Sequence, residues 1–445
     1  MTRKRTIENI VSISNSEEEI KTKKTSNDEH NENNYLGIGP FSNEIELCVS
    51  DINAVDLIKS TTLPVMHETN RRDMLELVVS MDKNLAELNN NLSTLTSDLS
   101  KKVESMNGQL YGGSTVLEKV SDLKPKPASE DIDCVFGSAI KGFMNITSHQ
   151  VVVGIKDEKI GWEIYNTSKY LSPLLIALTA SSPYMHNQKG GLENTLNQSI
   201  RPLQYQKMFK YFPNSFWKET KDIRSIDELK LELEQVHNSI LSYIELGRIP
   251  ETKWDELRKE RKDALGNKYT YEQKIRDSET AKVFFYWFVR PRLAHETISK
   301  GGDCVMSLEF RAPDTALNTG YMKNINRFVI GTCNYIANEG GDSIMKDLHI
   351  DKRDDVFCQM LECGKYGLNA SINSEKAGLQ IQKLGKYAIR GLELSNDHYN
   401  ANLLTDFLED VRINGNPADR MQKAFNNRTP SVNELKSYLI EELRR

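Results

Sequence analysis

Residues 149–155, HQVVVGI, form an almost unbroken run of apolar and β-branched side chains. A run of this length and kind is typical of a strand buried on both faces. Such a strand needs other strands at its edges and further structure over its faces, so the chain is expected to fold around a sheet.

Three other segments are predicted to be strands. NEIELCVSDI (43–52) alternates in polarity and would place Glu44, Glu46 and Cys48 on one face. FFYWFVRPR (284–292) and CVMSLEFRAPD (304–314) read as a hairpin-like pair, joined by a loop that holds two consecutive glycines.

Helical spacing dominates elsewhere. The pattern predicts a helix over 71–106, in which Leu85, Leu88, Leu92, Leu95 and Leu99 form a stripe. Packing of this stripe on the chain's own sheet is favoured, and packing between copies in a homo-oligomer is the alternative. A further helix is predicted over 164–181. Residues 317–445 are expected to be mainly helical, with a loop at 414–419.

These patterns suggest one large unit with additions. Residues 1–34 are rich in Lys, Glu, Asn and Ser and are expected to form a disordered tail, since they offer little apolar surface to bury. Residues 35–430 would form a single catalytic domain. Within it, 225–266 is expected to be a helical insertion of two charged helices, and 431–445 a closing helix.

Composition excludes some classes of function. The 445 residues hold 58 Lys and Arg against 63 Asp and Glu, which gives a net charge of −5 and no global basic field for nucleic acid. The six scattered cysteines suit reduced thiols rather than zinc or a disulfide framework. No apolar run reaches the roughly 20 residues of a membrane span, so a cytoplasmic protein is expected, with no membrane partner.

Paired carboxylates are the first candidates for chemistry. Residues two apart on a strand share a face, so Glu44 and Glu46 offer adjacent oxygen ligands of the kind that Mg²⁺ prefers. A solvated strand face would also account for them. Glu76, eight residues after Glu68, lies among apolar residues, where a charge needs a partner or a metal. The polar edge of an amphipathic helix is the alternative.

SLEFRAPD (307–314) is the most informative single stretch. On a strand it would place Glu309 and Arg311 on one face, as a salt bridge or as a site that binds metal and phosphate. Arg290 and Arg292 precede it. Several arginines beside several carboxylates suit phosphoryl transfer, which depends on positioning and charge neutralisation. There is no Walker P-loop, no G-x-G-x-x-G after a strand and no nucleophile motif.

Taken in order, these stretches resemble the glutamate–cysteine ligase family, in its carboxylate–amine ligase branch. NEIEL (43–47), HETNRRDMLELV (67–78) and YLSPLLIALTASSPY (170–184) are similar to segments of that family. So are WFVRPR (287–292) and SLEFRAPD. KYGLNA (365–370) and GNPADR (415–420) are weaker similarities, and the resemblance covers roughly 35–420.

The resemblance implies an α+β fold of the glutamine synthetase type, an antiparallel sheet funnel wrapped by helices. It implies ATP and Mg²⁺ as cofactors and small-molecule substrates: glutamate or a similar carboxylate, and an amine such as cysteine. The carboxylate would be phosphorylated, and the amine would attack the acyl phosphate to form a γ-glutamyl amide.

The resemblance also assigns roles to residues. Glu44, Glu46, Glu76 and Glu309 would bind metal, and Glu309, Arg311 and Arg290 would form the catalytic set. Gln150, Arg201 and Arg292 would bind substrate or ATP.

The chain departs from the family pattern near the substrates. Gln150 stands where the family has the first histidine of an H-V-H-V-G strand, and Val152 replaces the second. Two alternatives to the ligase therefore stay open. One is a catalytically degenerate relative that binds a metabolite or a protein. The other is phosphoryl transfer to a small molecule without ligation.

Overall fold

The computed structural model describes residues 35, 37–66, 73–114, 117, 146–186, 191–209, 222–245, 255, 258–262, 268–270, 273, 288–293 and 304–445. The expected tail at 1–34, the acidic Glu68 and the glycine loop at 301–302 lie outside them. No helix in these ranges is long and apolar enough to cross a membrane.

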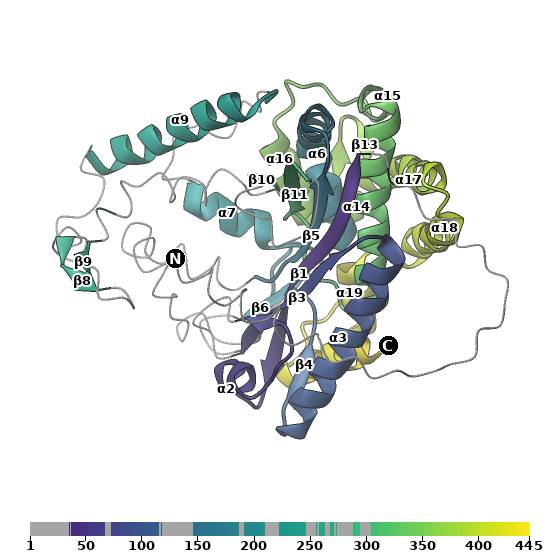
Figure 1. Ribbon diagram of the computed structural model, residues 1–445. Coiled ribbons are helices and arrows are strands. Elements are labelled where there is room, and N and C mark those ends of the chain that lie inside the picture. Colours follow the sequence, from purple (N-terminus) through teal and green to yellow (C-terminus); the bar gives the residue numbers. More distant parts are fainter. Residues whose placement is uncertain are drawn as a thin grey trace, which may run out of the picture.

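A seven-stranded sheet forms the centre of the fold, in the order β10-β11-β5-β1-β3-β2, with β4 pairing on β1 (Figure 1). The strands are β1 (Ile38–Ser50), β2 (Val65–Met66), β3 (Met74–Asp82), β4 (Gln109–Tyr111), β5 (His149–Ile155), β10 (Val289–Leu293) and β11 (Met306–Phe310). The strand pairs just named are all antiparallel. The predicted α+β class with an antiparallel sheet is confirmed, and all seven residues of β5 are buried.

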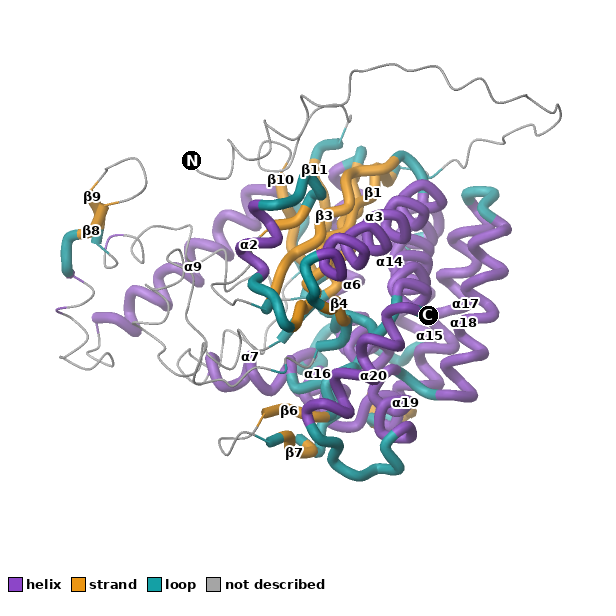
Figure 2. The backbone as a smooth tube through the Cα atoms, turned by 90° about the horizontal axis from the view of Figure 1, so that it is seen from below, coloured by secondary structure: helices purple, strands orange, loops and turns teal. Residues whose placement is uncertain are grey.

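Helices cover one face of this sheet. They are α3 (Leu85–Ser105), α6 (Glu158–Thr179) and α14 (Thr319–Glu339), and α17 (Ala377–Leu394) and α18 (His398–Asn414) pack behind α14 (Figure 2). Ile45 of β1, Val151 of β5 and Leu308 of β11 are fully buried in the core between sheet and helices. Because side chains alternate along a strand, the neighbours of these residues point to the opposite face.

Residues 74–82 correct the helix predicted over 71–106. They form β3, which runs along β1 with Met74 opposite Cys48 and Val79 opposite Asn43. The consecutive Val78 and Val79 suit a strand, and pairing with β1 satisfies the backbone groups of this segment. The helix α3 begins only at Leu85, and its buried leucines pack on the chain's own sheet, as favoured.

The C-terminal part is mainly helical, as predicted. Besides α14, α17 and α18 it contains α15 (Asp342–Asp347), α16 (Val356–Tyr366), the 3₁₀ turn η4 (Gly367–Asn369), α19 (Pro417–Ala424) and α20 (Val432–Arg444), with short strands β12 (Ser371–Ile372) and β13 (Glu375–Lys376). The predicted loop at 414–419 is mostly wrong. Asn416 and Asp419 form a capping box, and Pro417 is the first residue of α19, a position that suits proline.

The remaining elements are short or peripheral. They are α2 (Ala54–Lys59), β6 (Tyr184–His186), β7 (Leu192–Asn194), α7 (Arg201–Phe209), α9 (Ile226–Glu245), β8 (Arg261–Lys262) and β9 (Lys268–Tyr269). The first helix of the predicted insertion is present as α9, which extends away from the sheet (Figure 1). The second cannot continue to residue 266, because Arg261 and Lys262 pair with β9 instead.

Candidate active site

Strand register gathers the predicted site residues on the face of the sheet opposite the helices. Glu46 pairs with Glu76 across β1 and β3, and Glu44 pairs with Gln150 across β1 and β5. Glu309 pairs with Arg290 across β11 and β10. Directly opposed residues of antiparallel strands point to the same side. Glu44 and Glu309, which are 265 residues apart in the sequence, therefore lie on the same face of one sheet, because β5 pairs with both of their strands.

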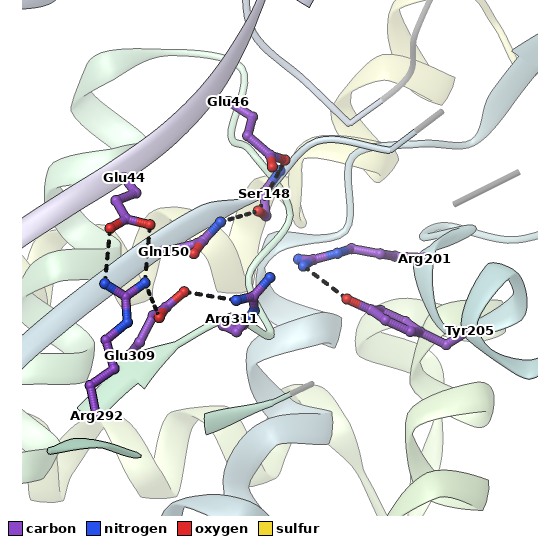
Figure 3. Close-up of polar contacts among 9 residues, drawn as sticks. All are labelled: Glu44, Glu46, Ser148, Gln150, Arg201, Tyr205, Arg292, Glu309 and Arg311. Atoms are coloured by element: carbon purple, nitrogen blue, oxygen red, sulfur yellow. Dashed lines mark hydrogen bonds and ion pairs between the residues drawn. The ribbon is translucent and has the colours of Figure 1, made fainter. Parts of the chain in front are cut away.

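Arg292 links two of the carboxylates. Its Nη1 lies 3.3 Å from Oε1 of Glu44 and its Nη2 lies 3.4 Å from Oε2 of Glu44. The same Nη2 forms a short ion pair with Oε2 of Glu309 (Figure 3). One planar guanidinium thus bridges β1 and β11.

Gln150 and Arg311 complete the environment of Glu309. Nη1 of Arg311 donates to Oε1 of Glu309 at 3.0 Å. An amide oxygen that faced two carboxylates would be repelled, so the Gln150 amide takes the orientation with its nitrogen toward Glu44 and Glu309, turned over relative to Figure 3. In this orientation it donates to Glu309 and, at 3.3 Å, to Oε2 of Glu44, and its oxygen lies 3.1 Å from the Ser148 hydroxyl oxygen.

These charges shift one another's pKa values. Burial acts to raise the pKa of the fully buried Glu309, but Arg311, Arg292 and Arg290 lower it below its usual value. Burial likewise acts to lower the pKa of Arg292, and the charges of Glu309 and Glu44 raise it overall. Glu309 and Arg292 are therefore both ionised throughout the neutral range.

Glu46 is held by a residue that the sequence analysis did not identify. Its Oε2 accepts from the backbone N–H of Ser148 at 2.6 Å and from the Ser148 hydroxyl at 3.0 Å. Ser148 stands two residues before Gln150, so a same-face argument on this strand would have found it. Its hydroxyl donates to Glu46 and lies 3.1 Å from the amide of Gln150, so it connects the two halves of the site (Figure 3).

Arg201 lies beside the site at the start of α7. Its Nη1 donates to the carbonyl of Pro313 at 2.7 Å, and its Nη2 approaches the Tyr205 hydroxyl at 3.5 Å. Arg201 and Arg311 line one small recess, together with apolar side chains that include Phe288 and Phe357. The structure thus brings Arg201 near the phosphate-binding candidate Arg311, although its strongest contact is to backbone.

Asp314, the last residue of SLEFRAPD, was not predicted to belong to the site. It is fully buried, and its Oδ2 accepts from the backbone N–H of Ser181 at 3.2 Å. Burial raises its pKa to about 6, against the opposing effects of Arg201 and of hydroxyl groups that include Ser199. The segment it anchors pairs with the chain at Ser148, next to Glu46.

The four acidic residues differ in how well they suit a divalent cation. Within the described ranges, no three His, Cys, Asp or Glu side chains are grouped closely enough to hold a metal by themselves. Mg²⁺ usually takes one or two protein carboxylates and completes its shell with substrate phosphates and water, so Glu46 and Glu76 fit it. Glu44 and Glu309 do not fit in this arrangement, because Arg292 lies between them.

Comparison with known proteins identifies the fold. No protein-family model matches the chain, and a search of curated protein sequences finds no match. Among solved structures, the chain is similar to glutamate–cysteine ligase from Francisella tularensis in complex with AMP. The TM-score is 0.56 at 12% identity, over 92% of this chain and 88% of that one.

A second similar structure is a bifunctional glutathione synthetase from Pasteurella multocida. The TM-score is 0.51 at 14% identity, over 91% of this chain and 52% of that one, so this chain spans about half of the bifunctional protein. The chain therefore has the fold of glutamate–cysteine ligase. The resemblance found in the sequence is confirmed at the level of the fold.

Proposed function

We propose that this protein is an ATP-dependent carbon–nitrogen ligase that joins a carboxylate, glutamate or a close relative, to an amine. The observation that carries the proposal is the convergence of Glu44, Glu46, Glu76, Glu309 and Arg311 on one sheet face. These residues come from three strands, β1, β3 and β11, and from the position that follows β11, in a fold that the chain shares with a glutamate–cysteine ligase.

The reaction would proceed in two steps. An oxygen of the substrate carboxylate attacks the γ-phosphorus of ATP, the bond to the bridging oxygen breaks, and ADP leaves. The amine nitrogen then attacks the acyl carbon, inorganic phosphate departs with one former carboxylate oxygen, and the nitrogen loses a proton. Both steps need neutralisation of phosphoryl charge.

The chain's own residues would supply that neutralisation. Arg311 is fixed by Glu309 at 3.0 Å and can present its remaining N–H groups to a phosphoryl oxygen. Arg290 of β10 lies opposite Glu309 of β11 and would neutralise charge on the same phosphoryl group. Arg201, at the recess it shares with Arg311, would bind the carboxylate of a substrate.

Glu46 and Glu76 would hold Mg²⁺, which would screen the nucleotide phosphates. Ser148 orients the Glu46 carboxylate through two hydrogen bonds. Gln150 contacts Glu44, Glu309 and Ser148, so we assign it a positioning role beside the substrate-binding role implied by the resemblance.

The test is a product screen with the purified full chain, Mg²⁺-ATP, glutamate and a panel of amines that includes cysteine. The proposal predicts ADP release that depends on one amine, and a new amide by mass spectrometry. ADP formation with a stable phosphorylated product would indicate small-molecule phosphorylation instead. No ADP with any amine would refute catalysis of this class under these conditions.

One observation favours a second candidate, a catalytically degenerate relative that binds a metabolite or protein. Arg292 already pairs with two of the expected metal-binding carboxylates. Calorimetry separates the two candidates. Binding of Mg²⁺-ATP supports the ligase, and undetectable binding at millimolar nucleotide supports the degenerate relative.

A further inference from the structure

The side chain of Arg292 lies between the carboxylates of Glu44 and Glu309. Arg292 approaches both oxygens of Glu44, at 3.3 and 3.4 Å, and pairs with Oε2 of Glu309. Oε1 of Glu309 receives Arg311 and the amide of Gln150. All four oxygens of the pair therefore have cationic or N–H partners.

The charge balance is also complete. Two carboxylates face two guanidinium groups, and Arg290 adds a further positive charge that lowers the pKa of Glu309. A divalent cation placed here would add two positive charges to a largely enclosed cluster in which the guanidinium groups already balance the carboxylates, which is costly. It would also need oxygens within about 2.1 Å, a space that the guanidinium fills.

The position of Arg292 beside Glu309 is fixed by strand pairing. Arg292 lies on β10, which pairs along its length with β11, the strand of Glu309. Its side chain is only 20% exposed, and the Glu309 side chain is fully buried. A planar, weakly hydrated guanidinium is well suited to this position, and an ammonium group is not.

We infer that Arg292 takes the place of a divalent cation between Glu44, Gln150 and Glu309. The four acidic residues then divide into two pairs with different tasks. Glu46 and Glu76 form the metal-binding pair, and Glu44 and Glu309 form a pair neutralised by arginine that positions Arg311. The inference rests on the proposed function only in assuming that a divalent cation accompanies the nucleotide.

The test counts Mn²⁺ bound to the full-length protein in the presence of ADP, by electron paramagnetic resonance. Glu44→Gln should change the Mn²⁺ dissociation constant by less than twofold, whereas Glu46→Gln should weaken it at least tenfold. An equally large weakening by Glu44→Gln would overturn the inference, because it would make Glu44 a metal ligand.

Arg292→Ala provides the converse measurement. Removal of the guanidinium should open the pair, so that the variant binds one more Mn²⁺ than the parent chain and loses it again in the Arg292→Ala, Glu44→Gln double variant. Arg292→Lys, which keeps the charge, is the matched control and should not gain the ion. A parent chain and an Arg292→Ala variant with equal Mn²⁺ counts would contradict the inference.

If Arg292→Ala does not fold, the Glu44→Gln comparison decides alone, since it leaves Arg292 in place. The metal count needs no turnover, so its outcome is separate from that of the ligase assay. An active ligase with two Mn²⁺ ions that both depend on the Glu44–Glu309 pair would sustain the proposed function and reject this inference.

Discussion

Glu46 on β1 lies directly opposite Glu76 on β3, with their side chains on the same face of the sheet. Opposed residues of antiparallel strands have Cβ atoms about 5 Å apart, and like charges at that spacing destabilise a sheet. Glu76 is only 4% exposed, which adds to the cost of its charge. A cation held between the two carboxylates would offset that cost.

This relationship predicts that Mg²⁺ stabilises the folded chain through Glu76. At a concentration about 100 times its dissociation constant, a ligand that binds only the native state adds roughly 2.7 kcal/mol to the free energy of unfolding. The increase in Tm with Mg²⁺ should be lost in Glu76→Gln. Glu409→Gln, an exposed change on α18 on the helical side of the sheet, serves as the control and should keep the full Mg²⁺ response. An undiminished response in Glu76→Gln would rule out this pair as the metal site.

Ser148 should act as a positioning residue for metal binding. Ser148→Ala removes the hydroxyl that donates to Glu46 at 3.0 Å but leaves the backbone N–H bond at 2.6 Å. A hydrogen bond to a charged group contributes about 1.5–3 kcal/mol, so the apparent KM for Mg²⁺ should rise roughly tenfold or more. Ser148→Thr keeps a hydroxyl and should restore most of the affinity. Equal KM values for the alanine variant and the parent would remove Ser148 from the site.

Asp314 should make stability depend on pH in the acidic range. Its folded-state pKa is raised to about 6 from an ordinary 3.8 by burial, so the folded chain binds a proton more readily than the unfolded chain. This group therefore favours the unfolded state above pH 6, and its unfavourable effect is relieved as pH falls from about 6 to 3.8. Urea titrations at a series of pH values should show that Asp314→Asn removes this part of the pH dependence of the free energy of unfolding. An unchanged pH profile in Asp314→Asn would contradict the assignment.

A buried amide network supports β1 from the helical side. Nδ2 of Asn43 donates to Oδ1 of Asn326 at 2.9 Å, and Nδ2 of Asn326 donates to Asn89 at 2.9 Å. Asn326→Leu would remove the donor to Oδ1 of Asn43 and to Oδ1 of Asn89, at about 1–3 kcal/mol for each buried oxygen left unsatisfied. Urea unfolding should show that loss, and an exposed change on the same helix, Glu339→Ala, should cost much less. A loss below 1 kcal/mol in Asn326→Leu would show that the network is not needed.

The strands of the site were predictable because their signals are local. The β-branched run at 149–155 and the alternation around Glu44 each specify a strand within a few residues. Glu76 was misplaced on a helix, since MLELVV is compatible with both periodicities and only pairing with β1 decides between them. The strand order and the Arg292 bridge were beyond prediction, because they depend on which strands become neighbours and on a contact between residues 248 apart in the sequence.

The three segments whose predicted structure was wrong share one physical cause, a partner elsewhere in the chain or a capping residue. Residues 74–82, 261–262 and 417–419 each adopt a structure set by a partner: β1 for the first, β9 for the second, and the Asn416–Asp419 capping box for the third. Tertiary or capping partners override local preference in such segments. The buried aspartate Asp314 was visible in SLEFRAPD, but only the fold reveals that it is enclosed.

Transfer of oxygen from the carboxylate to phosphate tests the central claim most directly. The full chain is incubated with Mg²⁺-ATP, the amine that supports ADP release, and glutamate whose γ-carboxylate carries ¹⁸O. An acyl-phosphate route predicts that each inorganic phosphate released contains one ¹⁸O atom, detected by mass spectrometry or by the ³¹P isotope shift. ADP released with unlabelled phosphate would contradict the account.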